Sequence, residues 1–164
     1  MALVTTIGGA SSDSYGTLAD YQAYAASMGW TLSGVDATDE QNLRRATQVL
    51  DRGFSFIGYR QYQTQALAWP RIVSDLVKDW PVDADTIPQD IIDAQFEVAY
   101  LIQGGLDAFA TITATVSRTR VKAGPVESET EYTGGKATPR LVAVEGLLGP
   151  YLKAGRGQIA LVRA

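Results

Sequence analysis

The sequence predicts a mainly helical α+β fold: a small bundle of about four helices, one charged β-hairpin, and extended arms at both ends. Three observations support this prediction. Apolar residues recur at helical spacing in four segments between residues 17 and 153. Residues 111–132 are rich in threonine, valine and alternating charges, which is typical of paired strands. The 164 residues, 46% of them hydrophobic, suffice for a single domain with one core.

The composition excludes several classes of catalytic and metal site. The chain has no cysteine and no histidine, so it has no disulfide, no thiolate or imidazole metal ligand, and no catalytic group built on either residue. Its net charge of −4 argues against strong binding to nucleic acid through phosphate neutralisation, although a local basic patch remains compatible with it. The sequence has neither a basic leader nor an apolar run of about 20 residues. We therefore expect a soluble protein made in the cytoplasm.

Residues 1–16 are expected to form an N-terminal arm. Residues 2–7 alternate weakly in hydropathy and could pair as a strand, whereas residues 8–16 resemble a flexible linker of small residues. A helical core is expected over residues 17–108. Its first helix starts with the capping-box spacing of Thr17 and Asp20. The predicted apolar face consists of Leu18, Tyr21, Ala25 and Met28, with Gly29 ending the helix.

A second helix is expected to start at Thr38, with this threonine as N-cap and Gln41 at the third helical position. Glu40 and Arg44 are four residues apart, a favourable pair worth about 0.3–0.5 kcal/mol. The residues expected to face the core are Leu43, Ala46, Leu50, Phe54 and Ile57.

The helix with the widest apolar face is expected to begin at Pro88, because proline suits the first helical position. Two glycines, Gly104 and Gly105, end it. An apolar arc this wide must be covered from more than one direction, so we predict that this helix is the centre of the core. The arc contains Ile87, Ile91, Ile92, Ala94, Phe96, Val98, Ala99, Leu101 and Leu106, and the expected solvent side carries Asp90, Asp93 and Glu97.

Residues 59–86 show neither helical nor strand periodicity. Long loops of this kind in compact domains are usually functional or pack on another surface. Trp69 and Trp80 each precede a proline, which favours extended backbone. Aromatic side chains beside Arg60 and Arg71 could stack single-stranded bases, but a tryptophan next to proline in an apolar segment is more often part of a core or an interface. The aromatic residues considered are Tyr59, Tyr62, Trp69 and Trp80.

The hairpin expected over residues 111–132 has the sharpest pattern in the chain. Alternate residues share one face of a strand, and these positions are basic in the first strand and acidic in the second. A two-residue turn at Gly124 and Pro125 makes three opposite-charge pairs, each worth about 0.2–1 kcal/mol. The pairs are Arg118 with Glu131, Arg120 with Glu129, and Lys122 with Glu127.

Three interpretations of this hairpin remain open. It could be a solvated ladder without a partner, an arm that contacts a neighbouring subunit, or a basic strand that contacts DNA; the glutamates oppose the last. A final helix is expected over residues 138–153, with Leu141, Val144, Leu148 and Leu152 facing the core. Residues 154–164 are expected to form a C-terminal arm. In this arm Ile159, Leu161 and Val162 are candidate contacts to a subunit or partner.

Three local patterns are similar to ligand sites but incomplete. Residues 83–88 lack the third acidic position and the glycine of a calcium-binding EF-hand loop. Residues 134–137 lack the first glycine and the hydroxyl residue of a P-loop. Residues 155–160 match a dinucleotide fingerprint, but the four residues that follow cannot complete a βαβ unit. We therefore predict no metal site, no cofactor and no enzymatic activity.

Several moderate motifs occur in a distinctive order. Leu-Ala-Trp-Pro-Arg at residues 67–71 precedes an acidic loop, and a helix begins Ile-Pro-x-x-Ile-x-x-Ala-x-x-Glu. This order resembles the head–tail connector (adaptor) proteins of tailed bacteriophages, in the branch labelled DnaT-like single-stranded-DNA-binding. The resemblance covers most of the chain, including residues 14–21, 41–52 and 122–127. The motif residues are Trp69, Pro70, Arg71, Ile87, Pro88, Ile91, Ala94 and Glu97.

The resemblance implies a structural virion protein at the head–tail junction. Such proteins form an oligomeric ring in the neck, commonly a dodecamer, between the portal protein and a tail-side neck or tail-terminator protein. DNA passes through the lumen without specific binding, and an acidic chain suits that passage. The alternative is a single-stranded-DNA-binding module like the primosome protein DnaT, which the branch label suggests and the net charge opposes.

Overall fold

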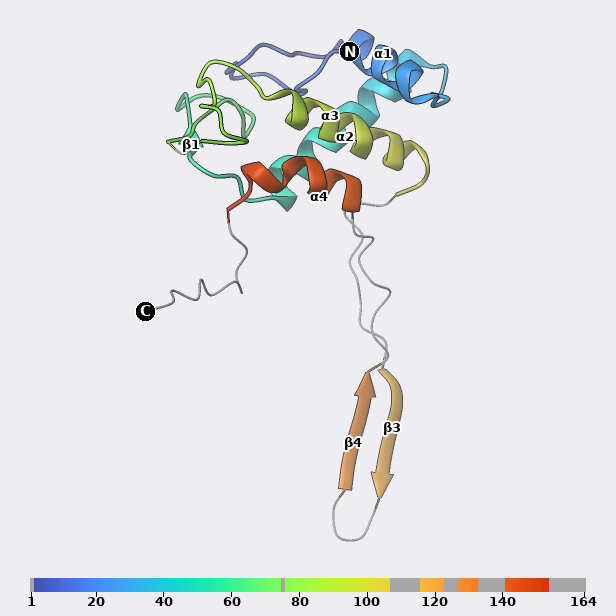
Figure 1. The fold of residues 1–164 in the computed structure, drawn as a ribbon. Helices are drawn as coiled ribbons and strands as arrows, with labels where there is room; N and C mark the ends of the chain where they lie inside the picture. Colours follow the sequence, from blue (N-terminus) through green and yellow to red (C-terminus); the bar gives the residue numbers. More distant parts are fainter. Residues whose placement is uncertain (1, 75, 107–115, 123–126, 133–140, 154–164) are drawn as a thin grey trace, which may run out of the picture. The chain divides into compact units, whose positions relative to one another are not determined.

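The computed structural model describes residues 2–74, 76–106, 116–122, 127–132 and 141–153. These residues form four α-helices, a short 3₁₀ helix and two small antiparallel sheets, which confirms the predicted mainly helical α+β fold (Figure 1). The chain divides into two compact units. The larger comprises residues 1–108 and 142–164, and the smaller comprises residues 109–141.

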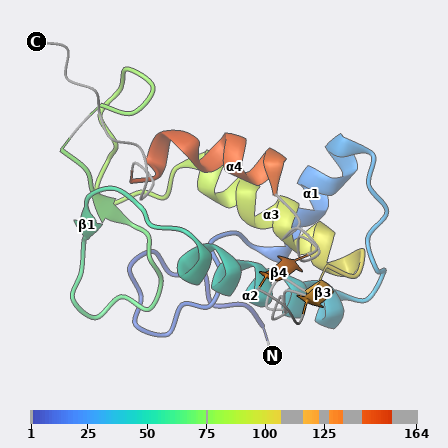
Figure 2. The ribbon, with the colours of Figure 1, turned by 90° about the horizontal axis from the view of Figure 1, so that it is seen from below.

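Helix α3 (Gln89–Gln103) is the central helix of the larger unit, as predicted. It packs against each of the other three helices, α1 (Leu18–Met28), α2 (Asp36–Gly53) and α4 (Val142–Leu148). Figure 2 shows α4 lying along α3. The apolar residues of α3 that are buried are Ile91, Ala94, Phe96, Val98 and Ala99.

Two details of the α3 prediction are wrong. The helix begins at Gln89, because Pro88 has an extended ψ of 140° and serves as the N-cap. Leu101 is 38% exposed. It lies about 120° around the helix from Gln95, the centre of the buried arc, so solvent reaches it at the edge. The three acidic residues lie on the side away from Gln95 and are partly exposed, in line with the expected solvent side.

Helix α1 begins with the predicted capping box. The Thr17 hydroxyl accepts a hydrogen bond from the Asp20 amide at 3.1 Å, and the Asp20 carboxylate accepts one from the Thr17 amide at 3.3 Å. Gly29 ends the helix with a left-handed φ of 70°. Met28 is 50% exposed, contrary to prediction. Trp30 covers this end of the unit instead, because its ring stacks on Tyr100 with the centroids 4.2 Å apart.

Helix α2 begins at Asp36, two residues before the predicted N-cap, so the Thr38 prediction is wrong. The reason is the turn that precedes it. The Ser33 hydroxyl accepts a hydrogen bond from the Val35 amide at 3.1 Å and donates one to the buried Asp39 carboxylate at 2.7 Å. Leu43, Ala46 and Leu50 are fully buried as predicted, whereas Phe54 and Ile57 follow the helix and are half-buried.

The expected N-terminal strand over residues 2–7 does not form among the described residues. The segment is a loop closed by Asp13, whose amide donates to the Val4 carbonyl at 2.9 Å and whose carboxylate accepts from the Val4 amide at 2.8 Å. The prediction of a flexible linker is also wrong from Ser12 to Gly16. Ser12, Ser14 and Gly16 are buried because polar partners inside the unit satisfy their hydrogen bonds.

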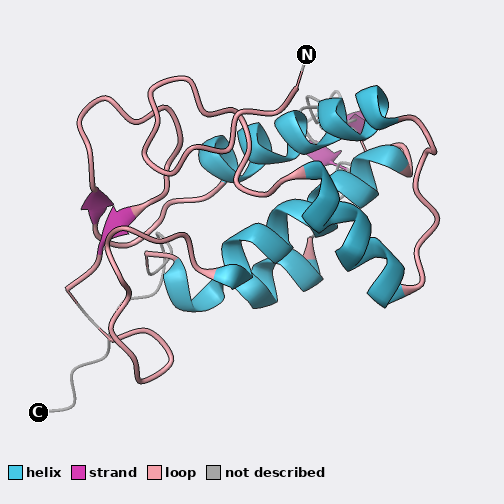
Figure 3. Ribbon diagram, turned by 90° about the horizontal axis from the view of Figure 1, so that it is seen from above, coloured by secondary structure: helices cyan, strands magenta, loops and turns pink. Residues whose placement is uncertain are grey.

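The long segment before α3 contains a small sheet that the sequence pattern did not predict. Strand β1 (Tyr59–Arg60) pairs antiparallel with β2 (Arg71–Ile72), and this sheet lies among the loops at one end of the helices (Figure 3). Gly58 enters β1 with a φ of 67°, and a Cβ atom there would lie 2.1 Å from the Ile72 carbonyl oxygen. Only glycine fits this approach. The Trp69–Pro70 peptide bond is cis.

Helix α4 is shorter than predicted. It ends at Leu148 and is followed by the 3₁₀ helix η1 (Gly149–Tyr151), because Pro150 cannot continue α-helical hydrogen bonding. Val144 and Leu148 are fully buried, as expected. Residues 138–140 of the predicted helix lie outside the described residues.

The smaller unit contains the predicted hairpin. Strand β3 (Val116–Lys122) pairs antiparallel with β4 (Glu127–Tyr132). All three predicted pairs are confirmed: Arg118 opposite Glu131, Arg120 opposite Glu129, and Lys122 opposite Glu127. Residues 111–115, 123 and 126 of the expected strands lie outside the described residues, and the register is irregular between Val116 and Arg118. The predicted turn at Gly124 and Pro125 lies outside the described residues.

Candidate interaction surface

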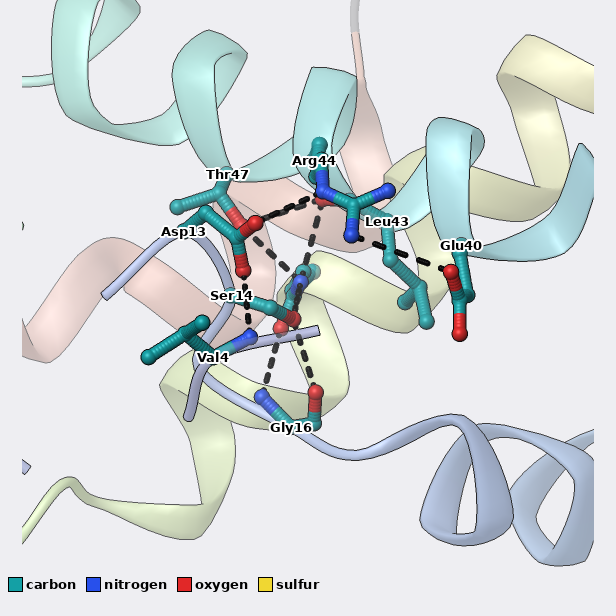
Figure 4. A network of polar contacts seen from close by, with 9 residues as sticks. Val4, Asp13, Ser14, Gly16, Glu40, Leu43, Arg44 and Thr47 are labelled. Atoms are coloured by element: carbon teal, nitrogen blue, oxygen red, sulfur yellow. Dashed lines mark hydrogen bonds and ion pairs between the residues drawn. The ribbon is translucent and has the colours of Figure 1, made fainter. Parts of the chain in front are cut away.

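A buried amide on α3 joins the N-terminal segment to α2. The Gln95 side-chain oxygen accepts a hydrogen bond from the Gly16 amide at 2.9 Å. Its nitrogen, which has two N–H groups, lies within hydrogen-bonding distance of three acceptors: the Ser14 hydroxyl at 2.7 Å, the Thr47 hydroxyl at 2.9 Å and the Leu43 carbonyl at 3.1 Å. Figure 4 shows these four partners converging from two segments. Because every polar atom of Gln95 is satisfied internally, this network supports the fold and offers nothing to a ligand.

A second group of polar contacts lies beside this network. The Arg44 guanidinium contacts the Asp13 carboxylate at 2.7 Å and, at 3.7 Å, the predicted partner Glu40 (Figure 4). Asp13 also closes the N-terminal loop. These carboxylates are therefore tied to a cation and a backbone amide, which is a structural arrangement.

Arg71, in the predicted family motif, binds backbone carbonyls. Its guanidinium donates to the carbonyl oxygens of Ile57 and Gly58 at 2.7 Å each, and to those of Ala68 at 3.2 Å and Phe56 at 3.4 Å. Burial, and then the charge of Arg60, lower the pKa of Arg71. Arg71 thus clamps the β1 segment and has few donors left for a phosphate.

Trp69, the neighbouring motif residue, belongs to the core. It is 1% exposed. Its ring meets the rings of Phe56 and Tyr151 edge-on, with each pair of centroids 5.7 Å apart. This position confirms the core interpretation and excludes base stacking by Trp69 in this conformation.

Asp51 on α2 links the same motif to the N-terminal segment. Its carboxylate accepts hydrogen bonds from the Tyr15 hydroxyl and, at 2.9 Å, from the Ala68 amide. Burial raises the pKa of Asp51 even though both hydrogen bonds favour its charged form. Burial and the charge of Asp51 raise the pKa of Tyr15 well above its usual value. The contact is a buried polar link between three segments.

The remaining motif residues also position the fold. Ile91 and Ala94 are fully buried in α3, and Pro70 is also buried. Ile87 and Pro88 are half-buried at the start of α3. The motif residue Glu97 accepts a hydrogen bond from the Tyr24 hydroxyl at 3.2 Å, and burial followed by the charge of Glu97 raises the pKa of Tyr24 to about 12. The motif therefore marks architecture, with no cluster of reactive groups.

The most exposed large apolar side chains of the described residues are Trp80, at 75%, and Leu76, at 66%. Both belong to a tight turn over residues 76–80, which we call the Trp80 turn. Val77 and Trp80 exchange two backbone hydrogen bonds, of 2.8 and 3.1 Å. The two residues between them, Lys78 and Asp79, have left-handed φ angles of 52° and 68°. The turn thus presents two apolar side chains on a held backbone.

Asp90 at the start of α3 anchors this turn. One of its carboxylate oxygens accepts hydrogen bonds from the Lys78 ammonium at 2.6 Å and from the Tyr151 hydroxyl at 2.7 Å. Burial alone would raise the pKa of Asp90, but the two hydrogen bonds outweigh it and the pKa is lowered. The same carboxylate therefore joins the turn, α3 and the end of η1.

Of the three aromatic residues exposed in the described part of the chain, Tyr62 contacts a carboxylate, Trp80 follows one in sequence, and Tyr59 precedes Arg60. The Tyr62 hydroxyl donates to the Asp85 carboxylate at 2.7 Å, and this hydrogen bond raises the pKa of Tyr62. Trp80 follows Asp79, and the nearby Lys78 ammonium is paired with Asp90. A base stacked on the Tyr62 ring would bring its phosphate close to the Asp85 carboxylate, which disfavours binding there.

No group of three or more acidic side chains within the described part of the chain is placed to hold a metal ion. No helix among these residues is both long and apolar enough to cross a membrane. The six charged residues of the hairpin occupy facing positions in one register. Ile159, Leu161 and Val162 lie outside the described residues, so their expected role as subunit contacts stays a prediction.

Sequence reasoning missed Gln95, Asp51, Asp90 and the exposure of Leu76. One signal was present for Gln95, because a glutamine at the centre of an apolar helical arc must find buried partners. The other three depend on segments that meet only in the folded chain.

A family model described as "Putative DnaT-like ssDNA binding protein" matches residues 1–164. No curated protein matches the chain, and no solved structure does. The family description carries the label of the branch named above and mentions no connector.

Proposed function

We propose a structural function, from the premise that the chain belongs to this DnaT-like family, whose model covers its whole length. In this proposal the chain is one subunit of a connector ring at the head–tail junction of a tailed bacteriophage. The ring joins the portal protein to the tail-side proteins and surrounds the DNA channel. The observation that carries the proposal is the β3–β4 sheet.

This sheet has only two strands in the described part of the chain, so β3 and β4 each have one open edge. An isolated two-stranded hairpin is marginally stable in water, and open edges present unpaired N–H and C=O groups. Edges of this kind accept a strand from another chain. Because the three facing charge pairs can be satisfied within the hairpin, its edges remain available for a neighbouring subunit or the portal.

The negative charge of the chain supports a channel that does not bind DNA tightly. The net charge is −4, and Tyr62 and Trp80 lie beside carboxylates. Arg44, Lys78 and Arg71 bind groups of their own chain. A net acidic chain lets DNA move past, because phosphate contacts provide most non-specific affinity.

A charge-reversal cycle on the hairpin tests the proposal. The variants are Arg120→Glu, Glu129→Arg and the double reversal, with Arg45→Glu on the exposed face of α2 as a control that changes the net charge by the same amount as Arg120→Glu. Ring assembly is measured by electron microscopy and sedimentation, alone and with the portal protein, and core stability by thermal melting. We expect each single reversal to reduce assembly, the double reversal to restore it, and Arg45→Glu to leave it intact.

Two outcomes would contradict this scheme. A chain that stays monomeric in every condition, including with the portal, would refute the connector function. A double reversal that impairs assembly more than either single change would show that the charges face a neighbour, because it presents the wrong sign to both contacts. That result would refute the intrachain charge pairs, but it would remain consistent with the proposed connector ring.

Single-stranded-DNA binding is the second candidate, and the family description favours it. It is tested by titrating salt against oligonucleotide affinity, since phosphate contacts give log K a slope of about −0.7 per contact on log salt. We expect no measurable binding at physiological salt. Tight binding that weakens steeply with salt would make this the function in place of the connector.

A further inference from the structure

We infer that the apolar C-terminal segment, residues 158–162, binds the Trp80 turn of the same molecule. The turn exposes Leu76 and Trp80 more than any other large apolar side chains of the described residues. Two large apolar side chains exposed on one turn form an apolar surface that a second apolar segment can cover. Four observations support this contact: the fixed backbone of the turn, the position of the chain end beside it, the complementary chemistry of the two segments, and the short connection between them.

The exposure is built into the backbone of the turn. Lys78 and Asp79 both adopt left-handed φ angles, which are uncommon for residues other than glycine, asparagine and aspartate. Two backbone hydrogen bonds, the burial of Val77 and the ion pair of Lys78 with Asp90 hold the turn in this form. Leu76 and Trp80 are therefore presented outward by a fixed support, as an apolar contact requires.

The described chain ends beside this turn. Tyr151 and Lys78 donate to the same oxygen of Asp90. Two residues later the Lys153 amide donates to the Ser55 carbonyl at 2.8 Å, so the backbone is held up to this point. Residues 158–162 follow Lys153 by five to nine positions. Extended chain spans about 3.4 Å per residue, so this segment can reach the turn without disturbing the core.

The segment and the turn are chemically complementary. Residues 158–162 read Gln-Ile-Ala-Leu-Val, with three large aliphatic side chains. The loop over residues 73–86 has four aspartates and one lysine, and that lysine is paired with Asp90. Residues 154–164 contain Arg156 and Arg163 and no acidic residue. An apolar, basic segment thus meets an apolar, acidic loop.

The short tether favours the same molecule over a neighbour. A segment joined through the four residues 154–157 experiences an effective concentration of the order of millimolar, well above that of a second chain in dilute solution. Ile159, Leu161 and Val162 then contact their own chain, and the hairpin remains the arm that contacts neighbours. The inferred contact does not depend on the proposed connector ring, so an experiment that refutes one of them does not refute the other.

Cysteine cross-linking tests the contact directly, because the chain has no cysteine of its own. Leu76→Cys is combined with Ala160→Cys in the full chain, and disulfide formation is followed on non-reducing gels under mild oxidation. The control pairs Ala160→Cys with Leu101→Cys, an exposed leucine eleven residues after Asp90 on α3. We expect the first pair to form an intrachain disulfide at least tenfold faster than the control. Adding Leu161→Asp should reduce the rate to that of the control.

Two results would overturn the inference. Cross-linked dimers instead of an intrachain product would show that the segment binds another chain, and equal rates in both pairs would show that it does not bind the turn. A second measurement needs no cysteine. Acrylamide quenching of Trp80, isolated by comparison with Trp80→Phe, should increase at least twofold when Ile159 and Leu161 are both replaced by aspartate. Unchanged quenching would also refute the contact.

Discussion

Replacing Gln95 by leucine tests the buried network with little change in side-chain volume. The substitution removes the acceptor of the Gly16 amide, and an unsatisfied buried donor costs about 1–3 kcal/mol. It also removes the two N–H groups that the Ser14, Thr47 and Leu43 oxygens share. These losses are smaller, because Ser14 still donates to the Gly16 carbonyl at 2.7 Å and Thr47 to the Leu43 carbonyl at 3.0 Å. We expect a total loss of about 2–4 kcal/mol.

This loss is large beside a domain stability of about 5–15 kcal/mol, and urea denaturation can measure it. Gln89→Leu is the matched control. Gln89 is exposed on the same helix and makes one side-chain hydrogen bond, to Asp93 at 2.8 Å, so its replacement should change stability by less than about 0.5 kcal/mol. Hydrogen exchange adds a local readout, since the Gly16 amide should exchange faster in Gln95→Leu. Equal stability of Gln95→Leu and the parent chain would refute the assigned network.

Three further predictions concern other parts of the core. Gly58→Ala should destabilise more than Gly29→Ala in urea melts by at least about 1 kcal/mol, because both have φ near 70° but only the first would clash; equal losses would contradict this. Phe96→Ala should cost about 3–5 kcal/mol and Asp93→Ala less than about 0.5, and similar effects would show that the faces of α3 are misassigned. The parent chain should have a larger free energy of unfolding than Asp90→Asn at pH values above about 4, the pKa of an unfolded aspartate. This difference should shrink as the pH falls through the lower pKa of Asp90 in the folded chain, and a difference that grows in acid would exclude the pKa shift.

Features that depend on near neighbours in sequence could be predicted. The capping box of α1 needs only Thr17 and Asp20, three residues apart. The register of the hairpin follows from a two-residue turn and the alternation of side chains, so the facing of Arg120 and Glu129 was predictable. The central position of α3 follows from the width of its apolar arc. In each case the spacing along the chain sets the geometry.

The tertiary structure decided which residues are buried and which distant segments meet, because spacing along the sequence does not specify either. Trp69 and Trp80 both precede proline, yet the first is buried and the second is exposed. The difference arises because Trp69 meets aromatic rings from two distant segments, whereas Trp80 is held outward by its turn. One carboxylate oxygen of Asp90 accepts hydrogen bonds from Lys78, 12 positions earlier, and from Tyr151, 61 positions later. Contacts across such separations depend on the path of the whole chain, because no local preference specifies which segments meet.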